Sequence, residues 1–98
     1  MTTILIRDVR FSPEVVEKIW MEHGLSQRFV EEVAYSGESE GRWDFDEVHG
    51  IRVVVRGETV EAVPRDTIVF LRPIDPENGI WDVITAFCPT NPNYGMED

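Results

Sequence analysis

The part of the sequence that decides the fold is the segment Gly79-Ile80-Trp81-Asp82-Val83-Ile84-Thr85-Ala86-Phe87-Cys88-Pro89. Its β-branched and aromatic residues predict a strand in the interior of a sheet. Strand side chains alternate, so one face is expected to carry Trp81, Val83, Thr85 and Phe87, and the other Ile80, Asp82, Ile84 and Ala86. Both faces are mostly apolar, and we therefore expect both to be covered except at Asp82 and Thr85.

Further strands are expected before this segment. Residues 51–56 alternate, so one face should carry Arg52, Val54 and Arg56, and the core face Ile51, Val53 and Val55. Residues 67–72 form the next strand, and the turn Asp75-Pro76-Glu77-Asn78-Gly79 joins it to the final strand as an antiparallel hairpin. A short strand is also expected where Trp43 and Phe45 alternate with charged residues, and residues 59–63 are expected to extend a hairpin.

The N-terminal part of the sequence predicts a strand and two helices. Residues 2–7 form the strand, at an edge of the sheet, with Ile4 and Ile6 on one face. Ser12 caps a helix that ends at Gly24, and Ser26 caps a second helix. The expected buried stripes are Val15, Val16, Ile19, Trp20 and His23 in the first helix, and Phe29, Val30, Val33 and Ala34 in the second. This order predicts an α+β domain, with the N-terminal strand and two helices packed on one face of a mainly antiparallel four- to five-stranded sheet.

Length and composition predict one domain. The 98 residues, 42% of them hydrophobic, suffice for a single two-layer core over residues 1–89, with residues 90–98 as a mobile tail. Neither a signal peptide nor a membrane-spanning run is expected, so we predict a cytoplasmic protein that does not contact a membrane. A lone Cys88 fits a reducing compartment, and its simplest interpretation is a small buried hydrophobic residue.

The net charge of −10 argues against a broad basic surface that gathers nucleic acid. A small basic pocket remains compatible with that charge. Eight of the nine cationic residues are arginines, whose forked donors suit carboxylate or phosphate groups better than lysine does.

Three groups of residues carry a family resemblance. The first is Glu17-Lys18-Ile19-Trp20-Met21-Glu22-His23-Gly24-Leu25-Ser26, and the second is Val30-Glu31-Glu32-Val33. The third is the closing run Trp81-Asp82-Val83-Ile84-Thr85-Ala86, which ends in Ile-Thr-Ala. Their order over residues 13–87 resembles BrnT-like toxins.

The resemblance implies the broad RelE, barnase and colicin-type ribonuclease fold. It implies a sheet whose concave face holds RNA, cleavage that needs no metal or cofactor, and an antitoxin as protein partner. After Ala86 this chain continues with Phe87-Cys88-Pro89, where BrnT-like chains carry Arg and a basic helix. Its acidic charge is also the reverse of that of the usual toxins.

Two histidines are candidates for the acid and base that metal-free RNA cleavage needs. His23 matches the helix-end histidine of the resembled motif, and histidine changes charge near neutral pH. The alternative is that His23 only interacts with the last carbonyls of its helix. His49 precedes the arginine-bearing strand, and the alternative there is an ordinary turn residue.

Four further residues are candidates for contacting the phosphate. Arg52 and Arg56 lie two positions apart on one strand face, about 7 Å, and can clamp one phosphate with help from Arg72. Thr85 can direct its hydroxyl towards the same place. The alternatives are ion pairs with carboxylates such as Asp82 for the arginines, and simple strand packing for Thr85.

Residues 44–49 hold Asp44, Asp46, Glu47 and His49, which lack the spacing of a known metal-binding loop, so no metal site is predicted.

Two hypotheses about function follow from the sequence. The first is a ribonuclease toxin that acts on RNA. The second is a non-catalytic acidic protein of the same fold that binds and modulates a basic protein partner, and a third possibility is an acidic mimic of nucleic acid.

Overall fold

The computed structural model describes residues 4–48 and 50–89. Its helices are α1 (Pro13–His23) and α2 (Gln27–Ser36), with short 3-10 helices η1 (Glu38–Glu40) and η2 (Pro76–Asn78). Its strands are β1 (Asp8–Arg10), β2 (Arg42–Asp46), β3 (Gly50–Glu58), β4 (Asp66–Asp75) and β5 (Ile80–Phe87). This arrangement confirms the predicted α+β class.

The five strands form one mixed sheet in the order β1-β5-β4-β3-β2. β1 runs parallel to β5, and all other neighbours are antiparallel. β5 lies between β1 and β4, so the segment quoted first is an inner strand, as predicted. β1 and β2 are the edges of the sheet in the described part of the chain.

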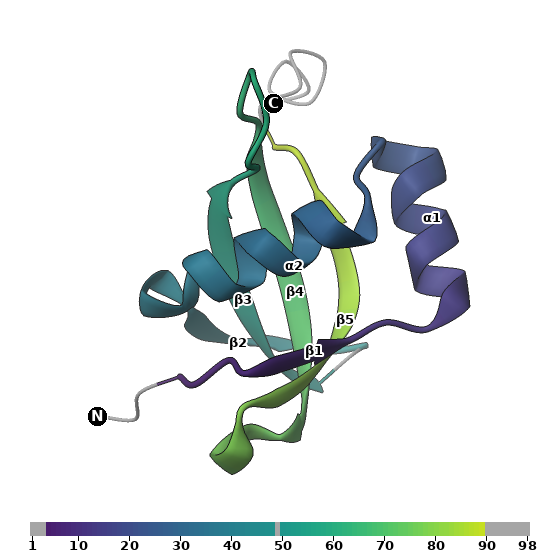
Figure 1. Ribbon diagram of the computed structural model, residues 1–98. Coiled ribbons are helices and arrows are strands. Elements are labelled where there is room, and N and C mark those ends of the chain that lie inside the picture. Colours follow the sequence, from purple (N-terminus) through teal and green to yellow (C-terminus); the bar gives the residue numbers. More distant parts are fainter. Residues whose placement is uncertain (1–3, 49, 90–98) are drawn as a thin grey trace.

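α2 lies across one face of the sheet, and α1 lies beside β5 at the margin of the sheet (Figure 1). α2 packs across β3 and β4, and α1 packs against β5. The side chains of Ser12 and Ser26 cap the two helices by accepting backbone N–H bonds, as predicted. α1 ends at His23, and its C-cap Gly24 has a φ of 64° that glycine adopts without strain. Within the described ranges, neither helix combines the length and the apolar character needed to cross a membrane.

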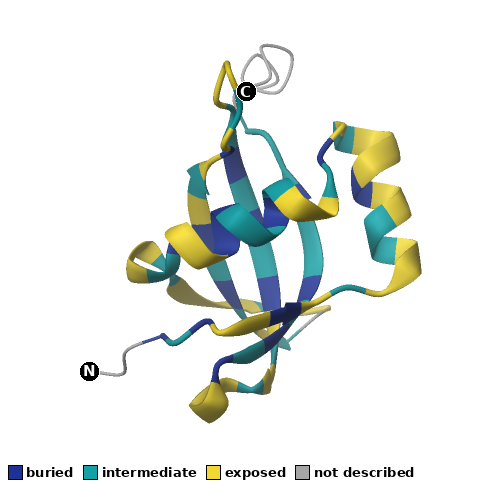
Figure 2. Ribbon diagram, in the orientation of Figure 1, coloured by how far each residue is buried: buried dark blue, intermediate teal, exposed yellow. Residues whose placement is uncertain are grey.

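The core lies between the helices and the sheet, where the buried residues form dark bands on the central strands (Figure 2). The sheet contributes Val53, Val55, Val69, Leu71, Trp81, Val83 and Ala86, and the helices with their connection contribute Ile19, Leu25, Val30, Val33 and Ala34. Trp81 is fully buried, and its indole Nε1 donates a 2.7 Å hydrogen bond to the Leu5 carbonyl. This bond holds the N-terminal segment against β5.

The predicted N-terminal strand is displaced along the chain. Among the described N-terminal residues, only Asp8–Arg10 pair with β5, although Ile4 and Ile6 are buried as expected. Gly79 in the turn before β5 accepts backbone bonds from Arg7 and Asp8, which fixes the point where pairing begins. Before that point the N-terminal segment is held by a side chain and not by strand pairing. The Glu38 carboxylate accepts a hydrogen bond from the backbone N–H of Ile6.

Other expectations were wrong at the margins of the sheet. Trp20 is 58% exposed, because α1 covers only the β5 side of the sheet and buries a narrow stripe around Ile19. Ile51 is exposed for a similar reason, since it lies at the start of β3, beside the edge strand. Residues 59–63 do not extend a hairpin.

A β-bulge changes the faces of β5. Phe70 is the register partner of Thr85, whereas the next residue of β4, Leu71, is the partner of Val83, so Ile84 is an extra residue. The strict alternation predicted for this strand therefore fails after Val83. Ala86 joins Trp81 and Val83 in the core, while Thr85 and Phe87 turn to the opposite face.

Candidate functional site

The face of the sheet opposite the helices collects most of the candidate residues. The register places on it Arg42 and Asp44 from β2, Arg52, Val54, Arg56 and Glu58 from β3, Asp66, Ile68, Phe70 and Arg72 from β4, and Asp82, Thr85 and Phe87 from β5. We call this surface the open sheet face, because α2, which packs across β3 and β4, lies on the other side.

The open sheet face carries only a small part of the acidic excess of the protein. With Asp8, Arg10, Asp46 and Asp75, which the register also places on it, the face has five arginines and seven carboxylates, a net charge of −2. The other four cations and twelve carboxylates of the sequence supply the remaining −8. An anionic ligand meets less repulsion here than elsewhere on the protein.

Three of these arginines form ion pairs across neighbouring strands. Arg52 Nη2 lies 2.9 Å from Asp44 Oδ2, Arg56 pairs with Asp66, and Arg72 pairs with Asp82. The hydrogen bond from Arg56 lowers the pKa of the Asp66 carboxyl, and the same contact raises the pKa of Arg56. All three arginines thus form the ion pairs with carboxylates that the sequence offered as the alternative to phosphate binding.

A line of contacting side chains crosses the open sheet face. The guanidinium carbon of Arg52 lies 4.1 Å from the centroid of the Phe70 ring, a cation–π contact. The Phe70 and Phe87 ring centroids are 5.7 Å apart, and the His23 ring centroid is 6.2 Å from that of Phe87. We call these four residues the aromatic row. It joins β3, β4 and β5 to the C-terminal end of α1.

The structure brings several predicted site residues together. Thr85 lies opposite Phe70 in the register, so it borders the aromatic row. Val53 and Leu71 are register partners, and Arg52 and Arg72 are their neighbours along the two strands. The two arginines therefore lie side by side on β3 and β4.

The other predicted residues lie apart from this group. Arg56 is turned to Asp66 and, with Arg42, lines a separate cleft of about 400 Å³ beside η1. Arg52 and Arg56 therefore face different partners and do not form the single clamp that was predicted. His49 lies outside the described residues.

Two members of the aromatic row were not among the predicted site residues. Phe70 alternates with core residues Val69 and Leu71, and its position beside Arg52 depends on the register between β3 and β4. Phe87 was assigned to the face of Trp81, because the bulge at Ile84 has no clear sequence signal. The sequence could have indicated Phe70, because Phe70 and Arg72 are two positions apart in residues 67–72 and therefore share a strand face.

Neither the acidic turn nor the cysteine forms a site in the described chain. Asp44 binds Arg52, and no group of three or more His, Cys, Asp or Glu in residues 4–48 and 50–89 is arranged to hold a metal ion. Cys88 is half-buried against the core, with its sulfur 3.9 Å from Thr67 Oγ1.

Comparisons with protein-family models, with curated proteins and with solved structures find no match to this chain. The resemblance to BrnT-like toxins therefore stays a prediction from short motifs.

Proposed function

We propose that this domain is a cytoplasmic ribonuclease of the BrnT-like type, which holds single-stranded RNA across the open sheet face. The observation that carries the proposal is the aromatic row, which ends in His23 at one side and Arg52 at the other. Stacking surfaces and cationic donors thus share the open sheet face, and an imidazole from the end of α1 lies at its border beside Phe87.

The aromatic row supplies binding that does not depend on net charge. Unstacked RNA bases bind to aromatic rings and guanidinium planes, and each stacked base contributes about 1–3 kcal/mol. Phe70 and Phe87 offer two neighbouring rings, and Arg52 offers a guanidinium beside them. A strand laid along this line crosses β3, β4 and β5.

Arg52 and Arg72 are the proposed phosphate donors. Their ion pairs with Asp44 and Asp82 are partly exposed, and pairs of this kind contribute only about 0–1 kcal/mol. A phosphate can therefore replace one carboxylate at small cost, while the guanidinium keeps its two-pronged geometry. The Arg72 side chain is the more accessible, at 55% exposed against 19% for Arg52.

His23 is the proposed acid–base residue. As the RNA 2′-oxygen attacks the phosphorus beside Phe87, the His23 imidazole accepts the 2′-hydroxyl proton, while Arg52 and Arg72, at the other end of the aromatic row, hold a neighbouring phosphate of the same strand. The P–O bond to the 5′-oxygen breaks, and that oxygen takes a proton from a second acid, leaving a 2′,3′-cyclic phosphate. His49 is the predicted residue for this second role.

The test is cleavage and binding of a fluorescein-labelled single-stranded RNA that contains all four bases, with EDTA present. His23→Gln should reduce cleavage about 100-fold or more while RNA affinity changes little. Arg72→Gln should weaken binding, whereas the matched variant Arg28→Gln, which removes an ion-paired arginine from the helix side, should not. Absence of both binding and cleavage in the wild type would overturn the proposal.

A non-catalytic interaction protein is the second candidate. The observation that favours it is that Arg52, Arg56 and Arg72 all have carboxylate partners already, in a protein with a net charge of −10. This candidate predicts salt-sensitive binding to a polycation such as polylysine, with neither binding nor cleavage of RNA.

A further inference from the structure

The edge strand β2 carries an apolar surface that no described element covers. Trp43, Phe45 and Ile51 are 43%, 69% and 58% exposed. Phe45 and Ile51 are register partners, and Trp43 is the partner of buried Val53, so the three side chains lie on the helix side of the sheet. With Asp44 they line an open hollow of about 540 Å³. Large exposed aromatic groups at one place are typical of protein-binding surfaces.

The backbone of β2 is also available for pairing. β2 is the last strand in the sheet order, and no strand in residues 4–48 and 50–89 pairs with its outer edge. Alternate N–H and C=O groups of an edge strand point away from the sheet and can pair with a further strand. Figure 2 shows β2 exposed over most of its length. The apolar hollow and the open edge therefore share Trp43, Asp44 and Phe45 of β2.

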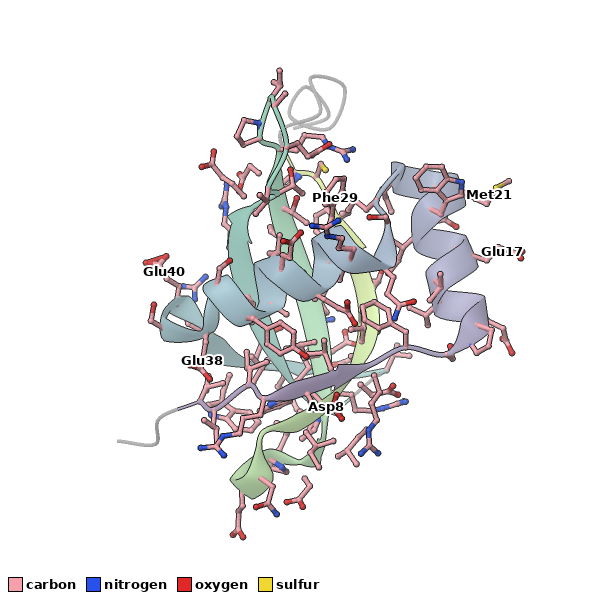
Figure 3. All side chains as sticks on the ribbon, viewed as in Figure 1. Asp8, Glu17, Met21, Phe29, Glu38 and Glu40 are labelled. Carbon is pink, nitrogen blue, oxygen red and sulfur yellow. The ribbon has the colours of Figure 1, made fainter. Side chains whose placement is uncertain are left out.

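The surroundings of this edge are acidic. Residues 38–47 hold five carboxylates and one arginine, a net charge of −4. Glu40 and Glu47 flank β2, both are exposed, and neither has an ion-pair partner among the described residues. Figure 3 labels Glu40 on the short helix η1 that leads into β2. We call Trp43, Phe45 and Ile51, with these two glutamates, the β2 edge site.

Charge decides which kind of strand fits the β2 edge site. A second copy of this chain would bring another net charge of −10, and its own acidic edge would meet the same acidic surroundings. Like charges on neighbouring strands destabilise pairing. A strand that carries Lys or Arg between apolar residues has the opposite charge and the matching alternation.

We propose that the β2 edge site binds an extended segment of a basic protein, which adds to the sheet as a sixth strand. Its apolar side chains pack against Trp43, Phe45 and Ile51, and its cationic side chains lie near Glu40 and Glu47. Backbone bonds to β2 supply the pairing, as in other cases of strand addition. The site lies on the helix side of the sheet and does not depend on RNA binding to the open sheet face.

The experiment uses three capped peptides, titrated into the 98-residue protein in low salt. The probe alternates Lys and Val over seven residues. One control replaces every Lys by Glu, and the other replaces the central Val by Pro, which removes a backbone donor and disfavours a strand. Calorimetry measures affinity, and amide hydrogen exchange measures whether β2 becomes protected.

The inference expects the Lys-Val peptide to bind at least tenfold more tightly than either control, and to slow exchange at β2. Phe45→Thr should weaken its binding about tenfold or more. Val63→Thr is the matched control, because Val63 is 78% exposed in a separate loop, and it should leave affinity unchanged.

Equal binding of the Lys and Glu peptides would overturn the inference, as would full affinity in Phe45→Thr or no protection of β2. Sedimentation that shows a dimer abolished by Phe45→Thr would also overturn it, because the occupant would then be a second copy. The RNA assays and the peptide assays can fail independently. Phe45→Thr leaves the aromatic row intact, and Arg72→Gln leaves the β2 edge site intact.

Discussion

Replacing Trp81 by phenylalanine tests how β5 and the N-terminal segment are held together. The change removes the indole N–H that bonds to the Leu5 carbonyl at 2.7 Å, and it leaves space in a fully buried position. Leu5 is half-buried, so water can partly replace the bond, and its loss should cost about 1 kcal/mol. The unfilled space should cost about 1–2 kcal/mol more. We expect Trp81→Phe to lower the free energy of unfolding by about 2–3 kcal/mol.

Urea denaturation followed by far-ultraviolet circular dichroism measures this loss without depending on tryptophan fluorescence. A loss of that size should lower the urea midpoint by about 1–3 M with little change in slope. Trp20→Phe is the matched control, because Trp20 is 58% exposed, and it should change stability by less than about 0.5 kcal/mol. Equal effects from the two substitutions would refute the assignment of Trp81 as the buried anchor.

Two further predictions concern the contacts around α2 and β3. Gly37→Ala would place a methyl group 2.5 Å from Val55 Cγ1, and we expect urea melts to show that the free energy of unfolding falls by about 1–3 kcal/mol. In the control Gly57→Ala the nearest atom lies 3.5 Å from the added methyl group. A comparable loss of stability in that control would contradict the close packing around Gly37. Because the folded-state pKa of Asp66 is lowered by Arg56, this contact stabilises the protein fully above the ordinary carboxyl pKa and is lost as pH falls through the lowered value. Asp66→Asn should therefore lower the urea midpoint at pH 7 and have a smaller effect near pH 3, and an equal effect at both would contradict the ion pair.

The helices and the hairpins follow from local signals in the sequence. Ser12 and Ser26 were recognisable as caps because a hydroxyl before a helical run satisfies a free backbone N–H, and Gly24 was recognisable as a stop. The turn before Gly79 likewise fixed the pairing of the last two strands. These features depend on a few neighbouring residues, which is why alternation and cap chemistry suffice to predict them.

The candidate site depended on long-range geometry and was predicted less well. Arg52 and Arg72 could be placed on one face from alternation, yet their ion-pair partners follow from strand register. The bulge at Ile84 turned Phe87 towards the arginines, and no local pattern marks it. Trp20 was expected inside because periodicity shows which residues share a helix face, while the position of the helix decides how much of that face is covered.

The proposed function requires that the open sheet face binds RNA. The most direct measurement is a titration of isotope-labelled protein with the single-stranded RNA, followed by nuclear magnetic resonance. We predict that the largest shifts occur at Arg52, Phe70, Phe87 and His23, with none on the outer surface of α2. Shifts confined to β2, or no shifts at saturating RNA, would contradict the account.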